Sequence, residues 1–154
     1  MPTDPKGRYV IEPSAGVERS VFAFLTDAYT EENISSANGK TDRRVLLKLH
    51  SALAPVKVAV LPLSRNEKLI PLAQEIHTII RKSSSIDGIV QYDDSQSIGR
   101  RYRRQDEIGT PLCVTVDFES LEDHAVTVRH RDTMKQTRVR IVDLQKELTT
   151  HLSE

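Results

Sequence analysis

The sequence predicts an α/β fold, a three-layer α/β/α domain around a mixed five-stranded sheet, preceded by a short strand and helix. From Pro55 onward, runs of β-branched and apolar residues alternate with segments whose apolar residues recur at helical spacing. Helical crossovers join parallel strands, whereas the short acidic turn ESLED allows an antiparallel pair. With 154 residues and 38% hydrophobic content, the chain can form one domain of ordinary size and a small appendage.

The composition excludes several classes of protein. Lys and Arg number 22, as do Asp and Glu, so the chain is not a generic polycation, and any nucleic-acid site must be a local patch. No apolar run approaches the roughly 20 residues that a membrane helix needs. A single cysteine, Cys113, permits no intrachain disulfide and fits a reducing compartment. We therefore expect a cytoplasmic protein.

The first 53 residues divide into two predicted segments. In residues 1–30, Tyr9–Ile11 predicts a strand, and apolar residues at helical spacing from Val17 predict a helix to about Tyr29. This unit is too small to bury its own apolar stripe. In residues 31–53, the polar stretch Glu31–Asp42 predicts a linker or exposed loop, and Arg43–Leu53 predicts a short helix.

Residues 54–154 form the predicted main domain. Pro71 is tolerated only near a first helical turn, so its helix is expected to begin close to Asn66–Lys68 and to include Ile80. The other predicted helices cover Ser97–Ile108 and Val142–Leu152. The predicted strands cover Val56–Leu61, Ile86–Tyr92, Leu112–Phe118, Ala125–His130 and Gln136–Ile141.

Two basic segments favour a site for a polyanion. In the helix Ser97–Ile108, Arg100, Arg103 and Arg104 share one side and Arg101 lies on a flank. The alternative for these arginines is a solvated face partly neutralised by acidic neighbours. The second segment is basic with one opposing carboxylate, Asp132. Its basic residues are Arg129, His130, Arg131, Lys135, Arg138 and Arg140.

Other candidate chemistry is weaker. The five histidines lack a metal-ligand spacing, and no second cysteine is available, so we expect no metal site. Cys113 lies in an apolar strand and is expected to be a small core residue rather than a nucleophile. Gly16 is not part of a glycine-rich phosphate loop. Ser14 and Arg19 flank a helix N-terminus that could hold an anion, with ordinary capping as the alternative.

Two stretches carry a resemblance to a known family. VIEPSAGVERSVFAFLTDAY (Val10–Tyr29) resembles motif 3 of class II aminoacyl-tRNA synthetases, in the form found in the glycine enzymes. LKLHSALAPVKVAVLPL and IGRRYRRQDEIGTPLCVTVDFESLEDHAVTVRHRDTMKQTRV resemble the C-terminal anticodon-binding domain of homodimeric glycyl-tRNA synthetases. The resemblance covers nearly the whole chain from about Tyr9.

The resemblance implies a parent enzyme that makes glycyl-adenylate from glycine and ATP with Mg²⁺, and then transfers glycine to tRNA. It places Glu12 in the glycine pocket, where a carboxylate can pair with the substrate ammonium, and Arg19 against the adenine. The positions matching the glycine pocket are Glu12, Pro13, Ser14, Ala15 and Gly16. Those matching the ATP site are Gly16, Val17, Glu18 and Arg19.

The chain departs from the family because motifs 1 and 2 are absent. We therefore expect a C-terminal piece, namely a remnant of the catalytic domain followed by the anticodon-binding domain, that is inactive alone. Its implied partners are glycine tRNA and the remainder of the synthetase. The resemblance also implies that this parent enzyme is homodimeric. The alternatives are one half of a split synthetase and an accessory or regulatory protein that uses a synthetase-like domain.

Glycine anticodons carry cytosine at their second and third positions. A cytosine offers an amino donor to a carboxylate and acceptors to an arginine, and RNA-binding proteins read such edges in unstacked loops. The candidates for the anticodon loop are Arg100, Arg103, Arg104, Asp106 and Glu107. The candidates for phosphate contacts are Arg129, Arg138 and Arg140. Internal ion pairs are the alternative for part of this set.

Overall fold

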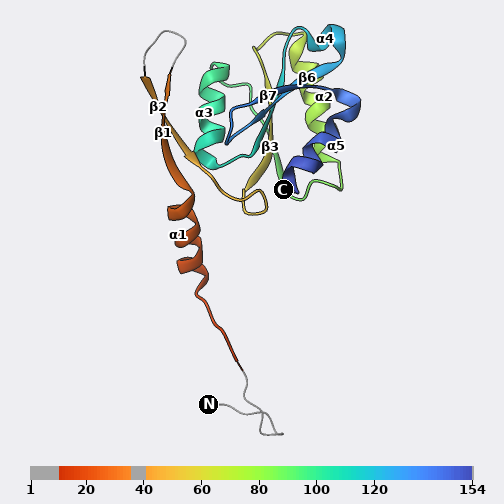
Figure 1. Cartoon of the computed structure of the whole chain (residues 1–154). Coiled ribbons are helices and arrows are strands. Elements are labelled where there is room, and N and C mark those ends of the chain that lie inside the picture. Colours follow the sequence, from red (N-terminus) through yellow and green to blue (C-terminus); the bar gives the residue numbers. More distant parts are fainter. Residues whose placement is uncertain (1–10, 36–40, 154) are drawn as a thin grey trace.

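A computed structural model describes residues 11–35 and 41–153, and it shows a sheet domain with a hairpin and a projecting helix beside it (Figure 1). The helices are α1 (Val17–Ala28), α2 (Leu69–Arg81), α3 (Ile98–Ile108), α4 (Ser120–Asp123) and α5 (Ile141–Leu152). The strands are β1 (Tyr29–Ser35), β2 (Thr41–Leu47), β3 (Val56–Pro62), β4 (Ile89–Tyr92), β5 (Leu112–Val116), β6 (Ala125–His130) and β7 (Gln136–Arg140).

The predicted three-layer domain with a mixed five-stranded sheet is confirmed. The strand order is β4-β3-β5-β6-β7, with β3 parallel to β4 and β5, and β6 antiparallel to β5 and β7. Helices α2 and α5 cover one face of the sheet, and α3 covers the other (Figure 1). The short acidic turn before β6 contains the four-residue helix α4.

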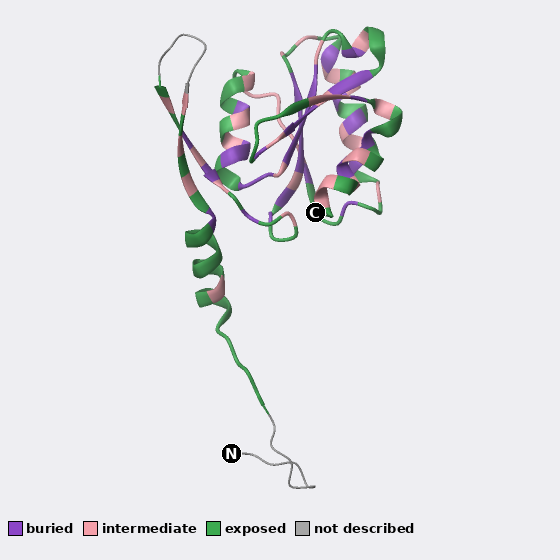
Figure 2. Ribbon diagram, in the orientation of Figure 1, coloured by how far each residue is buried: buried purple, intermediate pink, exposed green. Residues whose placement is uncertain are grey.

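The two faces of the sheet have different cores. Because side chains alternate along a strand, Val58 and Val60 of β3 join a large apolar core, whereas Ala59 and Leu61 join a small cluster with Cys113. The larger core holds Ala73, Ile76 and Ile80 of α2 and Leu144 and Leu148 of α5. Figure 2 shows the buried parts of these helices in purple. Burial raises the pKa of the Cys113 thiol to about 12, so it is the inert core residue that was predicted.

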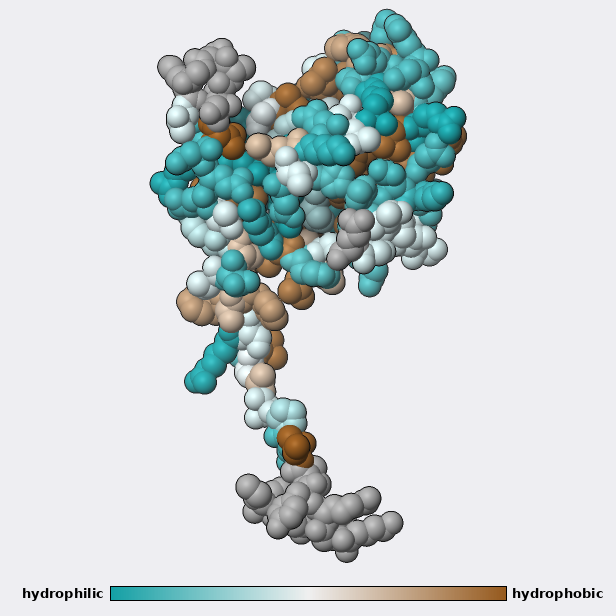
Figure 3. All heavy atoms as spheres, in the orientation of Figure 1, coloured by the Kyte–Doolittle hydropathy of each residue, from teal (hydrophilic) through white to brown (hydrophobic). Residues whose placement is uncertain are grey.

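The predicted helix after Val17 is confirmed as α1, whose apolar side chains are largely exposed. Phe22 is 72% exposed and Phe24 is 52% exposed, and the space-filling view shows apolar side chains along this projecting segment (Figure 3). Of the strand predicted at Tyr9–Ile11, the first two residues lie outside the described residues, and Ile11 is not in a strand.

Two predictions for residues 31–53 are wrong. In place of the predicted loop and helix, residues 31–35 and 41–47 lie in the antiparallel hairpin of β1 and β2, in which Tyr29 pairs with Leu47, and residues 48–53 are not helical. Residues 36–40 of the predicted loop lie outside the described residues. The polar residues of β1 suit a strand with one side in water, and β2 packs against α3. Long-range pairing therefore outweighs the local pattern in this segment.

Candidate nucleic-acid interface

Three parallel strands end at one edge of the sheet. The chain after β3 leads to α2, and the chain after β4 leads to α3 on the opposite face (Figure 1). In open α/β sheets, ligands bind outside the carboxyl ends of strands where neighbouring connections diverge in this way. A candidate site is therefore expected among the side chains at this edge.

The candidate interface consists of side chains at the ends of β3, β4 and β5 and on the first turns of α3, all partly or largely exposed. We call it the carboxyl-end surface. Its residues are Leu63, Arg65, Asp93, Asp94, Gln96, Arg100, Arg104 and Phe118.

Arg65 and Asp94 join the two loops of this surface. Nη2 of Arg65 donates to Oδ1 of Asp94 at 3.0 Å, and its Nε donates to the carbonyl oxygen of Asp94 at 2.9 Å. The Arg65 side chain is 66% exposed, so part of its guanidinium faces solvent. The pair thus presents a cation and an anion side by side.

Arg104 folds back from α3 onto the loop after β4. Its Nη2 donates to Oδ2 of Asp93 at 2.5 Å and to the carbonyl oxygen of Ser95 at 3.0 Å. Burial opposes ionisation of Asp93, but hydrogen bonds from Ser95 and Arg104 outweigh it and lower the pKa of this carboxyl. Asp93 is therefore a charged acceptor at neutral pH, and the Arg104 side chain keeps 36% of its surface exposed.

Arg100 differs from the other arginines of α3. Its side chain is exposed and makes no ion pair or side-chain hydrogen bond within residues 11–35 and 41–153. Because Arg104 is four residues later, the two side chains lie on the same side of the helix. Glu107 is likewise exposed and unpaired among these residues, but it lies near the other end of α3. Arg100 is thus a cation that an RNA phosphate can approach.

Arg103 and Arg140 are exposed but paired. Nη2 of Arg103 donates to Oδ2 of Asp42 on β2, so this side chain faces the hairpin rather than the carboxyl-end surface. Nη2 of Arg140 lies 2.7 Å from Oδ2 of Asp143. Ion pairs between side chains this exposed stabilise the fold only slightly, so either guanidinium can exchange its carboxylate for another partner at little cost.

Asp106 and Arg129 are not available to RNA, and their prediction as contact residues is corrected. Arg129 is 6% exposed and Asp106 is 2% exposed. Two Arg129 nitrogens donate to the Asp106 carboxylate at 2.9 and 3.1 Å, and Nε of Arg44 donates to it at 2.8 Å. Arg129 also lies over the Tyr102 ring at 4.7 Å. These groups join α3, β6 and the hairpin. For these two residues, the alternative of internal ion pairs is therefore the one that the structure shows.

Arg138 is committed in part to the fold. It donates to Oδ2 of Asp117 at 2.6 Å and to Oδ1 of Asp123 at 2.9 Å. The hydrogen bond with Asp123, followed by that with Asp117, raises the pKa of Arg138 although burial opposes this. Its side chain is 29% exposed, and the pairs fix the chain that follows β5.

Six residues of the carboxyl-end surface escaped the sequence analysis. A strand-end position was their one available signal, since each lies at the end of a predicted strand or shortly after it. Among them, Phe118 is 48% exposed, and exposed aromatic rings beside cations stack RNA bases. The six residues are Leu63, Arg65, Asp93, Asp94, Gln96 and Phe118.

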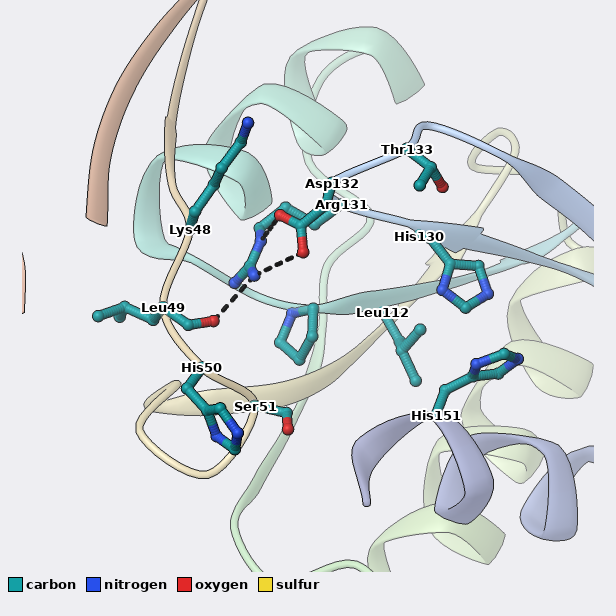
Figure 4. A pocket seen from close by; sticks show the side chains of 11 residues that line it. Lys48, Leu49, His50, Ser51, Leu112, His130, Arg131, Asp132, Thr133 and His151 are labelled. Atoms are coloured by element: carbon teal, nitrogen blue, oxygen red, sulfur yellow. Dashed lines mark hydrogen bonds and ion pairs between the residues drawn. The ribbon is translucent and has the colours of Figure 1, made fainter. Parts of the chain in front are cut away.

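A separate polar cavity of about 370 Å³ lies at the opposite end of the sheet (Figure 4). The His130 and His151 rings meet there with centroids 4.2 Å apart, and Arg131 donates to the carbonyl oxygen of Leu49 at 2.8 Å. Although His50 also lines this cavity, no group of three or more His, Cys, Asp or Glu side chains in the described part of the chain is arranged to hold a metal ion.

The residues matched to glycine and ATP sites form no enclosed site by themselves. From Ile11 to Arg19 every residue is exposed, on a single segment that precedes and begins α1. One exposed segment cannot surround a nucleotide or an amino acid, because such ligands bind in concave sites.

Within the described residues, no helix is both long and apolar enough to cross a membrane.

Comparison with known proteins agrees with this architecture. The anticodon binding domain family matches residues 57–151. The glycine–tRNA ligase of Thermobifida fusca is 54% identical over 94% of this chain and 30% of that ligase. The glycine–tRNA ligase of Cutibacterium acnes is 56% identical over 91% of this chain and 29% of that ligase.

A solved structure extends the comparison to three dimensions. The prolyl-tRNA synthetase of Cryptosporidium parvum, complexed with L-proline and AMP, matches with a TM-score of 0.62 and 25% sequence identity. The match covers 70% of this chain and 22% of that synthetase. The predicted resemblance to glycine–tRNA ligases is thus confirmed, although the chain spans about 30% of the length of these relatives. Since the family match covers more than half of its residues, the chain belongs to the anticodon binding domain family.

Proposed function

We propose that this chain binds the anticodon loop of glycine tRNA through the carboxyl-end surface. The observation that carries the proposal is the placement of exposed guanidinium groups beside charged carboxylates at the ends of three parallel strands. Membership of the anticodon binding domain family gives the class of ligand, and similarity to glycine–tRNA ligases gives the tRNA.

Cytosine recognition follows from the chemistry of two Arg–Asp pairs. In each pair, an Asp oxygen can accept from the cytosine amino group while the neighbouring Arg donates to the ring nitrogen or carbonyl oxygen. The pairs are Arg65–Asp94 and Arg104–Asp93, and both keep exposed surface. Phe118 supplies a face on which an unstacked base can lie.

The RNA backbone is contacted chiefly by Arg100. It is the exposed guanidinium of this surface without an acidic partner among the described residues. Because the chain has zero formal net charge, bulk attraction to RNA is weak, and affinity depends on this local contact and on the bases.

We further propose that the rest of a glycine–tRNA ligase covers α1. An apolar groove of about 280 Å³ lies between α1, the segment after β2 and the end of α3. Its α1 residues are Val21, Phe24 and Leu25, and their exposure in this chain suits a surface that a larger catalytic domain buries.

The complete ligase would then supply the chemistry that this chain lacks. Arg19 would contribute to its ATP site and Glu12 to its glycine site. ATP with Mg²⁺ would supply the adenylyl group of glycyl-adenylate there. We propose that the parent enzyme is a cytoplasmic homodimer, and that the chain alone is inactive in glycine-dependent ATP–pyrophosphate exchange. Turnover by the isolated chain would contradict this.

The anticodon proposal is tested by fluorescence anisotropy with two labelled RNA hairpins. One carries a glycine anticodon loop, and the other differs at the second anticodon base. We expect about 5- to 150-fold tighter binding to the first, because one matched base contact contributes about 1–3 kcal/mol of discrimination. Equal affinity for the two hairpins would instead support an accessory protein that is indifferent to the anticodon.

A further inference from the structure

We propose that Arg101 is the positioning residue that holds the two loops of the carboxyl-end surface in the geometry needed to discriminate anticodon bases. The inference rests on the proposed function and assigns a role to a side chain that contacts no RNA itself. Arg101 is 1% exposed, so it acts through the loops that it holds.

Arg101 differs from the other buried arginines of the described residues in what it binds. The others each pair with a carboxylate: Arg44 and Arg129 with Asp106, and Arg131 with Asp132. Arg101 forms no salt bridge among the described residues, and its buried Nε has no hydrogen-bond partner. Its role is therefore not that of a neutralised internal pair.

The hydrogen bonds of Arg101 run to backbone carbonyls at two strand ends. Its Nη1 donates to the carbonyl oxygen of Pro62, the last residue of β3, and to that of Asp93 at 3.3 Å. Its Nη2 donates to the carbonyl oxygen of Leu63 at 3.3 Å. One planar guanidinium thus ties the end of β3 to the residue that follows β4.

The tied residues adjoin both proposed base-reading pairs. Asp93 is itself a partner of Arg104, and Asp94 is the next residue. Arg65 lies two residues beyond Leu63, so the loop that Arg101 fixes also carries the second pair. A small displacement between the two strand ends would change the spacing of both pairs, and base discrimination depends on that spacing.

Burial of this cation is costly, and the cost is not offset within a local ion pair. Desolvation lowers the pKa of Arg101, and although the charges of Asp93 and Asp94 favour its charged form, they do not compensate fully. An apolar side chain of similar length would fill the same space without this cost. The guanidinium is therefore explained by the geometry that it imposes rather than by stability.

The test compares Arg101→Met and Arg101→Lys with the unaltered chain, using the two RNA hairpins described above. Methionine fills the space but donates no hydrogen bond, and lysine keeps the charge but lacks the planar fork. For both variants, we expect the ratio of the two dissociation constants to fall at least fivefold toward one. The salt dependence of binding to the glycine hairpin should stay unchanged, because Arg100 is intact. Arg81→Met, at an exposed position of α2, is the matched control and should keep the original ratio.

The ratio separates positioning from stability, because a partly unfolded sample weakens binding to both hairpins by the same factor. Variants that bind both hairpins more weakly but keep the original ratio would overturn the proposal. If circular dichroism shows that Arg101→Met is unfolded, the test rests on Arg101→Lys. A native spectrum of Arg101→Lys together with the original ratio of dissociation constants would contradict the need for the planar guanidinium. An unaltered chain that binds both hairpins equally would instead overturn the proposed function.

Discussion

The two faces of the five-stranded sheet are built from different chemistry. Beneath α2 and α5, Val, Ile and Leu side chains form a continuous apolar core. Beneath α3, the apolar cluster is small, and a buried ionic group of Arg44, Asp106 and Arg129 joins this helix to the hairpin. The first face supplies most of the hydrophobic stabilisation, whereas the second holds charged groups in fixed positions.

The largest expected effect is at the centre of the ionic group. Asp106→Ala leaves two buried guanidinium groups without their carboxylate and is expected to lower the free energy of unfolding by about 3–5 kcal/mol. Urea denaturation measures the loss. Asp143→Ala, which breaks an exposed pair with Arg140, is the control and should cost under about 1 kcal/mol. Similar losses for the two variants would contradict the assigned role of the α3 face.

On the apolar face, truncation of one core residue gives the corresponding measure. Leu148 of α5 is fully buried, so Leu148→Ala should cost about 2–5 kcal/mol through lost transfer free energy and a cavity. Val142→Ala, at a position that is 83% exposed on the same helix, should change stability by under about 0.5 kcal/mol. Equal urea midpoints for these variants would show that α5 does not pack as described.

Acidification tests the ion pairs that border the sheet. Burial opposes ionisation of Asp117, but Arg138 and Ser120 outweigh it and lower the pKa of this carboxyl. Its stabilisation is therefore complete above the unfolded value of about 3.9 and is lost as pH falls through the lower folded value. Asp117→Asn should cost about 1.5 kcal/mol at pH 7, since it removes charged hydrogen bonds. The difference in urea midpoint should shrink below about pH 4, and a constant difference down to pH 3 would contradict this.

The smallest effect on folding, with a clear effect on binding, is expected at Arg100. Arg100→Gln removes an exposed cation without a described partner, so stability should change by under about 0.5 kcal/mol. RNA affinity should fall, and the slope of log K against log salt should become shallower by about 0.7, as one single-strand phosphate contact is lost. Arg81→Gln is the control, and a slope equal to that of the unaltered chain would remove Arg100 from the interface.

Much of the fold could be predicted because its signals are local. A run of β-branched residues between prolines predicts the strand Val56–Leu61. The helix after Ser97 is predicted to end at the glycine and proline that follow Ile108. The hairpin could not be predicted in this way, because β1 is polar and owes its conformation to pairing with β2. Arg44 anchors it through Asp106, which is 62 residues away in the sequence.

The candidate site was predictable only in part. Sequence spacing placed Arg100 and Arg104 on one side of α3, and the structure places both beside the strand ends. The sequence could not distinguish Asp106 from Asp93, because both are acidic residues near arginines. Only the packing of α3 on the sheet decides which of the two is buried. Arg65 and Phe118 become candidates once the strand order brings the ends of β3 and β5 together.

The most direct test of the carboxyl-end surface is NMR mapping of amide shifts in the ¹⁵N-labelled chain during titration with the glycine anticodon hairpin. The account predicts that the largest changes cluster at residues 63–65, 93–100 and 117–118, and that the hairpin altered at the second anticodon base gives much smaller changes there. Changes centred on the cavity around His130 and His151 (Figure 4), with those three segments unaffected, would contradict it.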